Sequence, residues 1–220
     1  MRSKISAARS SRFRPLGDAG LPRTMRSEVV RGERRGRLSQ PHVAPLTDYV
    51  CELRARTGHE VPDFDPADGG ISASMVFLFE KPGPMTSASK TGRAGSGFIS
   101  RDNDDPTAEA TFRFMEQAGI PRREVVLWNV VPGWNGTRRI TRAELAAGVA
   151  EVERLLSLLP KVRSIVLVGR KAQRADRLIR ATGLPVLHSP HPSPLVRASR
   201  PAEWANIPNL WAVAWQSAGA

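Results

Sequence analysis

The chain has 220 residues, 40% of them hydrophobic, and one cysteine, Cys51. This length suffices for one α/β domain with a full core and a tail, and no apolar run approaches the roughly 18–20 residues of a membrane span. One cysteine excludes an internal disulfide and any iron–sulfur or zinc site built from several cysteines of this chain. We therefore expect a cytoplasmic monomer without a membrane partner.

The formal net charge of +12 is unevenly spread. Residues 1–40 carry 11 Lys or Arg side chains against three acids, and the other 180 residues carry 22 against 18. We interpret residues 1–40 as a basic, disordered extension and residues 41–220 as the folded domain. The extension is an arm for nucleic acid, a targeting peptide rich in Arg and Ser, or a functionless segment. A start codon assigned too early, with Met25 as the internal start, is a further form of the last alternative.

Strands and helices alternate along the folded part. The first predicted helix, Asp48–Thr57, is capped by Thr47 and ends at Gly58. Met75–Phe79 is a continuous apolar run, as in a strand covered on both faces. A long segment rich in Gly, Ser and Pro over residues 81–106 follows, and loops of this length are usually functional.

The second half of the chain continues the alternation. A helix starts at Asp105-Pro106, reaches Gln117 and stops at Gly119, before a strand over Val125–Trp128. A capping box then opens a helix with an apolar stripe. The remaining predicted elements are a strand over Ser164–Val168, a helix over Arg170–Thr182, a strand over Pro185–Leu187 and a helix over Pro201–Trp215, broken near Pro208. This order predicts an α/β fold, a three-layer α-β-α sandwich around a short, mostly parallel four-stranded sheet.

Each predicted strand runs into polar residues. Glu80 follows the first strand, Asn129 the second, Arg170 the third, and His188 and His191 the fourth. Ligands of open parallel sheets bind outside the carboxyl ends of the strands. We expect a carboxylate, an amide, a basic turn and a histidine to converge at this edge of the sheet.

Four motifs at these strand ends resemble the uracil-DNA glycosylase superfamily. His191-Pro-Ser-Pro-Leu195 looks like its C-terminal signature, and Glu80-Lys-Pro-Gly-Pro84 resembles its N-terminal motif. Trp128-Asn129 resembles the strand end with the base-reading asparagine, and Val166–Arg170 the third strand and turn. The resemblance covers residues 41–215. It implies an enzyme without metal or cofactor whose partner is DNA containing uracil or another damaged base.

The resemblance also implies roles for single residues. A glycosylase reads a base flipped out of the helix and stabilises the negative charge of the leaving base. His191 would donate a hydrogen bond to O2 of uracil, and Asn129 would read the edge of the base. The alternatives are a structural histidine in a loop and an asparagine that caps a turn.

Further residues are placed by the same resemblance. Phe98 would stack on the base, or else pack in the core or in its loop, and Leu195 would enter the vacated base stack. Contacts to the DNA backbone are expected from Pro82, Ser193, Arg197 and Arg170.

Lys81 departs from the pattern, since efficient members have Asp there and others Asn or Ala. A cation is an odd neighbour for a cationic transition state, so Glu80 becomes the candidate water activator. We place Lys81 with the base-binding residues, where it binds a phosphate or pairs with Glu80. A Schiff-base nucleophile is the remaining alternative.

We therefore predict a DNA base-excision repair glycosylase that hydrolyses the N-glycosidic bond of uracil, or of a related deaminated base, and leaves an abasic site. The main alternative is a glycosylase-fold protein that binds DNA or damaged bases without turnover. A nucleotide-binding α/β protein unrelated to DNA is the third hypothesis. The preferred lesion and strandedness stay open.

Overall fold

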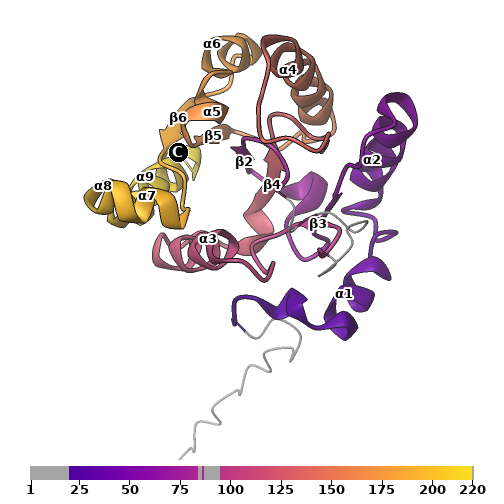
Figure 1. Ribbon diagram of the computed structural model, residues 1–220, viewed down its shortest axis with the longest axis horizontal. Helices are drawn as coiled ribbons and strands as arrows, with labels where there is room; N and C mark the ends of the chain where they lie inside the picture. The colour runs from indigo at the N-terminus through magenta and orange to yellow at the C-terminus, as the bar shows by residue number, and fades with distance from the viewer. Residues whose placement is uncertain (1–19, 84–85, 87–94, 220) are drawn as a thin grey trace, which may run out of the picture.

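The computed structural model describes residues 20–83, 86 and 95–219. Four parallel strands form the central sheet in the order β4-β2-β5-β6 (Figure 1). Their bounds are Val125–Asn129 for β4, Met75–Phe79 for β2, Ser164–Val168 for β5 and Val186–Ser189 for β6. A separate parallel pair joins β1 (Asp63–Phe64) to β3 (Phe98–Ile99). The predicted α/β class with a parallel four-stranded sheet is confirmed.

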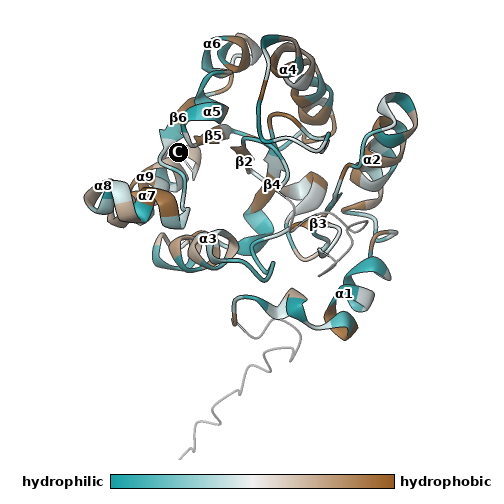
Figure 2. Ribbon diagram, in the orientation of Figure 1, coloured by the Kyte–Doolittle hydropathy of each residue, from teal (hydrophilic) through white to brown (hydrophobic). Residues whose placement is uncertain are grey.

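Helices cover both faces of the sheet because side chains alternate along its strands. On one face, the ring of Phe77 contacts Trp211 of α9 (Ile207–Gly219), which also contacts Phe114 of α3 (Pro106–Gln117). On the other face, Trp128 contacts Tyr49 of α2 (Ala44–Thr57), and the Tyr49 hydroxyl donates to a carbonyl of α4 (Arg142–Ser157). The helices carry both apolar and polar residues, as expected for elements buried on one side (Figure 2).

Local capping signals behave largely as predicted. The Asp105 side chain accepts hydrogen bonds from two backbone N–H groups at the start of α3, and Thr141 and Glu144 form the capping box of α4. The helix α2 begins at Ala44, earlier than predicted. Thr47 is not its cap, because its hydroxyl donates to the carbonyls of Leu38 and Val43 instead.

The C-terminal third is more divided than predicted. The prediction of a single helix over 170–182 is wrong. The segment consists of α5 (Arg170–Gln173), a turn at residues 174–175, α6 (Asp176–Ile179) and the 3-10 helix η5 (Arg180–Thr182), which follows α6 directly. Beyond β6 lie α7 (Pro194–Ser199) and α8 (Pro201–Ala205). The last break falls at Asn206, because Pro208 fits the first turn of α9, where its missing N–H is not needed.

The boundary predicted at residue 41 is wrong. Residues 24–35 form the 3-10 helix η1 (Thr24–Arg26) and α1 (Glu28–Arg35), and Met25 is buried. The Arg34 guanidinium lies in a buried ion pair, with 2.9 Å from Nη2 to Oδ2 of Asp102. A count of local charge could not show this, since the compensating carboxylates lie far along the chain. Residues 1–19 of the predicted extension lie outside the described residues.

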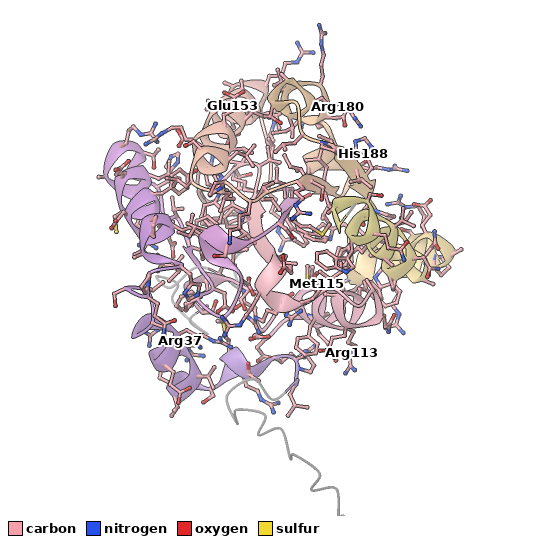
Figure 3. All side chains as sticks on the ribbon, turned by 180° about the vertical axis from the view of Figure 1, so that it is seen from behind. Arg37, Arg113, Met115, Glu153, Arg180 and His188 are labelled. Carbon is pink, nitrogen blue, oxygen red and sulfur yellow. The ribbon has the colours of Figure 1, made fainter. Side chains whose placement is uncertain are left out.

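Two short 3-10 helices, η2 (Gly70–Ser72) and η4 (Arg122–Glu124), precede β2 and β4. Figure 3 shows Met115 of α3 in the interior, whereas Arg113 and Arg180 extend outward. Among the described residues, no helix has the length and apolarity to cross a membrane.

Candidate active site

A cavity of about 340 Å³ lies at the carboxyl ends of β2 and β4. Glu80, Asn129 and His191 all line it, together with Phe79 at the end of β2. The register explains this, because Phe79 pairs with Asn129 and both strands end at the same edge. The structure thus brings together the predicted carboxylate, amide and histidine.

A second, outer cavity of about 570 Å³ adjoins the first. Glu80, Thr107, Arg138 and His191 line both cavities. The outer cavity also has a basic wall, to which Arg170, Lys171 and Arg200 contribute. A pocket with a carboxylate, an amide and an imidazole therefore opens into a space where four cationic side chains outnumber two carboxylates, Glu80 and Glu203.

His191 owes its position to a glycine on the neighbouring strand end. Gly169 has φ +89°, and a Cβ there would lie 3.0 Å from the Cβ of His191, so a larger residue would displace the histidine. The imidazole packs edge to face on Phe79, with 5.8 Å between ring centroids. The pKa of His191 is lowered, mainly because the imidazole is buried. The charge of Glu80 opposes this shift, and the charge of Lys171 adds to it. The ring is therefore neutral at pH 7, with one N–H to donate.

Asn129 presents a buried donor without a partner. Asn129 is 3% exposed, and its Nδ2 has no hydrogen bond within the part of the chain that the structure describes. A buried unpaired donor costs about 1–3 kcal/mol. Because the backbone is held by the β2–β4 ladder, the amide is preorganised for a ligand with an acceptor.

Glu80 pairs with a residue that the sequence analysis missed. Lys171, in the first turn of α5, donates from Nζ to Oε1 of Glu80 at 3.0 Å and to the Arg138 carbonyl at 3.3 Å. The basic turn after β5 was the available signal, but it directed attention to Arg170.

Lys81 does not form the predicted pair with Glu80. Its Nζ donates to Oδ1 of Asn135 at 2.6 Å and to Oε1 of Glu144 at 2.9 Å, and its side chain is 2% exposed. The backbone N–H of Thr141 and then Lys81 lower the pKa of Glu144 to about 2. The lysine lines the cavity, but its ammonium ties the first motif to the start of α4. This position supports neither the base contact, the phosphate contact nor the Schiff base considered for it.

Phe98 does not line the inner cavity. It is 1% exposed in β3, and the next residue, Ile99, lines the cavity instead. Successive side chains of a strand point to opposite faces, so Phe98 points away and the core-packing alternative holds. The described aromatic residues that line the cavity are Phe79 and Trp134.

The predicted DNA contacts lie in different settings. Pro82 lines the inner cavity, while Ser193 and Arg170 line the outer one. Ser193 also caps α7, and its hydroxyl accepts from the backbone N–H of Val196. Leu195, in the first turn of α7, is 77% exposed beside the outer cavity.

Arg197 is held away from that set. Its guanidinium lies over the ring of Trp204, 5.0 Å from the centroid, and it does not line the outer cavity. His188 lies within β6 (Figure 3). Its Nε2 is 2.6 Å from Oδ1 of Asp176. Of the two histidines predicted at this edge, only His191 lines the inner cavity.

The wall opposite the strand ends comes from the segment between β3 and α3. Arg101 and Asn103 line the cavity and are buried. The intervening Asp102 points into a buried ion-pair network, which sequence reasoning also missed. Arg122 lies at its centre, 2.7 Å from Asp65, 2.8 Å from Asp68 and 2.7 Å from Asp102. The charges of this network come from segments scattered over 90 residues, so no local pattern indicates it.

The described residues include no group of three or more His, Cys, Asp or Glu side chains arranged to hold a metal ion.

One comparison with known proteins agrees with the motifs. The family model described as Uracil DNA glycosylase superfamily matches residues 67–216, about two thirds of the chain. A solved structure described as wild-type UNG from Nitratifractor salsuginis is 15% identical, with a TM-score of 0.43, and the match covers 79% of this chain and 90% of that one. No curated protein matches.

Proposed function

Because this chain belongs to the uracil-DNA glycosylase superfamily, we propose that it is a DNA base-excision repair enzyme. It hydrolyses the N-glycosidic bond of uracil, or of a related deaminated base, and leaves an abasic site. The observation that carries the proposal is the single cavity lined by Glu80, Asn129 and His191 at the strand ends.

The proposed reaction uses two groups at the cavity mouth. The target nucleotide is flipped into the cavity, and the bond from C1′ to the base nitrogen breaks with its electron pair on the base. His191, as a neutral donor, hydrogen-bonds the base oxygen where negative charge develops. Glu80 orients a water molecule and takes its proton as the oxygen bonds to C1′. The base leaves as an anion and takes up, through solvent, the proton that Glu80 received, so the products are the free base and the abasic sugar and Glu80 is a carboxylate again.

Asn129 supplies the proposed selectivity. Its free Nδ2 donates to O4 of uracil, and its Oδ1 accepts from N3–H. Cytosine presents an amino donor and a ring acceptor at these positions, so both contacts become mismatched. The β2–β4 ladder fixes the backbone from which the amide projects, so its position against the edge of the base is set.

Contacts outside the pocket fit a nucleic-acid substrate. The basic wall of the outer cavity attracts the phosphate backbone. Leu195 is a large apolar side chain that projects beside it, which suits a wedge that fills the space of the flipped base.

A second candidate is a protein that binds DNA or damaged bases without turnover. The ion pair of Glu80 with Lys171 favours it, because it occupies one oxygen of the proposed water activator.

The test is single-turnover cleavage of a uracil-containing oligonucleotide by the full chain, beside His191→Ala and Asn129→Ala. His59→Ala and Asn209→Ala, at exposed positions outside both cavities, are the matched controls. We expect alkali-labile product from the wild type and both controls, and little from the cavity variants. DNA binding without product on uracil or on other deaminated bases would favour the second candidate.

A further inference from the structure

Lys171 joins the two cavities through one ion pair. Its Nζ is 3.0 Å from Oε1 of Glu80, and Glu80 lines both cavities whereas Lys171 lines the outer one. The two side chains are 44% and 27% exposed, in that order. The pair is therefore accessible to whatever enters the outer cavity.

This pairing opposes the proposed role of Glu80. An ammonium bound to Oε1 occupies a lone pair that would orient water. It also places a positive charge beside the site where positive charge develops on the sugar. With this pair in place, both the orientation of water by Glu80 and the stabilisation of the cationic sugar are weakened.

The outer cavity contains the chemistry to relieve this conflict. Arg170, Lys171 and Arg138 give it positive charge, whereas Arg200 is already paired with Glu203 at 2.7 Å. A phosphate oxygen in this cavity competes with Glu80 for the ammonium. Exposed ion pairs contribute little to stability, and a lysine stem is flexible, so the exchange of partners is easy.

A comparison with Lys81 shows that this property is particular to Lys171. The ammonium of Lys81 is bound by Glu144 and Asn135 at the end of a side chain that is 2% exposed. A phosphate cannot reach it without breaking that buried arrangement. Lys81 follows Glu80 in the chain and Lys171 is paired with Glu80, but only Lys171 can exchange its partner.

We propose that Lys171 is a positioning residue that a DNA phosphate draws from Glu80, so that the carboxylate becomes free only when the backbone occupies the outer cavity. The inference rests on the proposed function for its catalytic part. Its binding part, the competition of Glu80 and phosphate for one ammonium, holds without turnover.

The binding test uses a duplex with an uncleavable abasic analogue, and compares wild type, Glu80→Gln, Lys171→Met and the double variant. We expect Glu80→Gln to tighten binding about threefold or more, and most of this gain to disappear in the Lys171→Met background. Lys171→Met should also reduce the log–log salt slope by about one. Glu203→Gln is the matched control. It removes a carboxylate that is paired with Arg200, so any gain in DNA affinity that it gives should persist in the Lys171→Met background.

The excision test uses a series of uracil oligonucleotides, each with a single methylphosphonate in place of a different phosphate near the uracil. At saturation, the substitution at one position should lower the excision rate of the wild type about tenfold. The same substitution should not change the excision rate of Lys171→Met. Arg177→Met, of equal charge change outside both cavities, should respond to the methylphosphonate as the wild type does.

The outcomes separate the two proposals. Equal gains from Glu80→Gln with and without Lys171, or equal methylphosphonate effects in both proteins, would overturn the role of Lys171. Absence of excision with the expected binding pattern would overturn the proposed function and support the exchange of partners at Lys171.

Discussion

Two sets of ion pairs flank the inner cavity, and they differ in burial. Behind it, Arg122 and Arg34 bind Asp65, Asp68 and Asp102, and all five side chains are at most 9% exposed. At its mouth, the pair of Glu80 with Lys171 is partly exposed, with 27% and 44% of the two side chains open to solvent. A buried network holds one geometry because removing one member leaves uncompensated charge. An exposed pair changes partners at little cost.

The difference matches what each region does. The buried network joins the N-terminal helix α1, the loop before β2, the segment after β3 and η4. Arg101 and Asn103, on either side of Asp102, line the cavity, so the network positions one cavity wall. The mouth carries the groups that we propose respond to the substrate.

Removal of the central arginine tests the buried side of this comparison most severely. Arg122→Met should lower the free energy of unfolding by about 3–5 kcal/mol, because three buried carboxylates lose their shared partner. Denaturant titration measures it. The exposed Arg113→Met, which breaks a pair with Glu109, should cost at most about 1 kcal/mol; similar values for both would remove the distinction.

The strongest effect at the mouth concerns rate. His191→Ala should lower the saturated single-turnover rate about 10²–10³-fold, as loss of a donor to a developing anion does. The free energy of unfolding should change far less than in Arg122→Met. A variant that is destabilised yet equally fast would place His191 with the structural residues.

The two lysines beside the first motif give a matched pair. Lys81→Met leaves Glu144 and Asn135 without their buried donor and should cost about 1–3 kcal/mol of unfolding free energy. Lys171→Met should cost about 1 kcal/mol or less. Denaturant titration of both variants measures the two losses of unfolding free energy. A larger loss in Lys171→Met than in Lys81→Met would mean that burial does not determine the strength of the two ion pairs.

The smallest expected effect is a dependence of stability on pH. Burial lowers the pKa of His191, so below about pH 6.5 the unfolded chain binds a proton that the folded chain resists. Stability should therefore rise with pH from the folded pKa up to about 6.5, and be fully present above it. His191→Gln should remove this part of the slope in unfolding measured between pH 5 and 8, and NMR should show the imidazole titrating below its usual range.

Much of the fold follows from local signals. Continuous apolar runs mark β2, β4 and β5 because strands covered on both faces need no polar positions. Side-chain caps mark the starts of α3 and α4 within three residues. Polar residues directly after such strands must meet at one sheet edge, so the convergence of Glu80, Asn129 and His191 was predictable.

What failed depended on contacts distant in the sequence. Only packing shows that Ile99, rather than Phe98, faces the cavity. Only the approach of α4 shows that Lys81 turns to Glu144, which leaves Glu80 to Lys171. The ordered residues 20–40 depend on aspartates 30 to 70 residues away.

The sequence by itself determined the four strands of the central sheet, the order of the motifs and the chemical groups at the sheet edge, because these depend on apolar periodicity and on residues within a few positions of each other. It did not show the short pair of β1 and β3, which lies in segments that read as loops. The tertiary structure alone decided which cation pairs with which carboxylate. Ion-pair partners are chosen by distance and burial in space, and neither is written in local sequence.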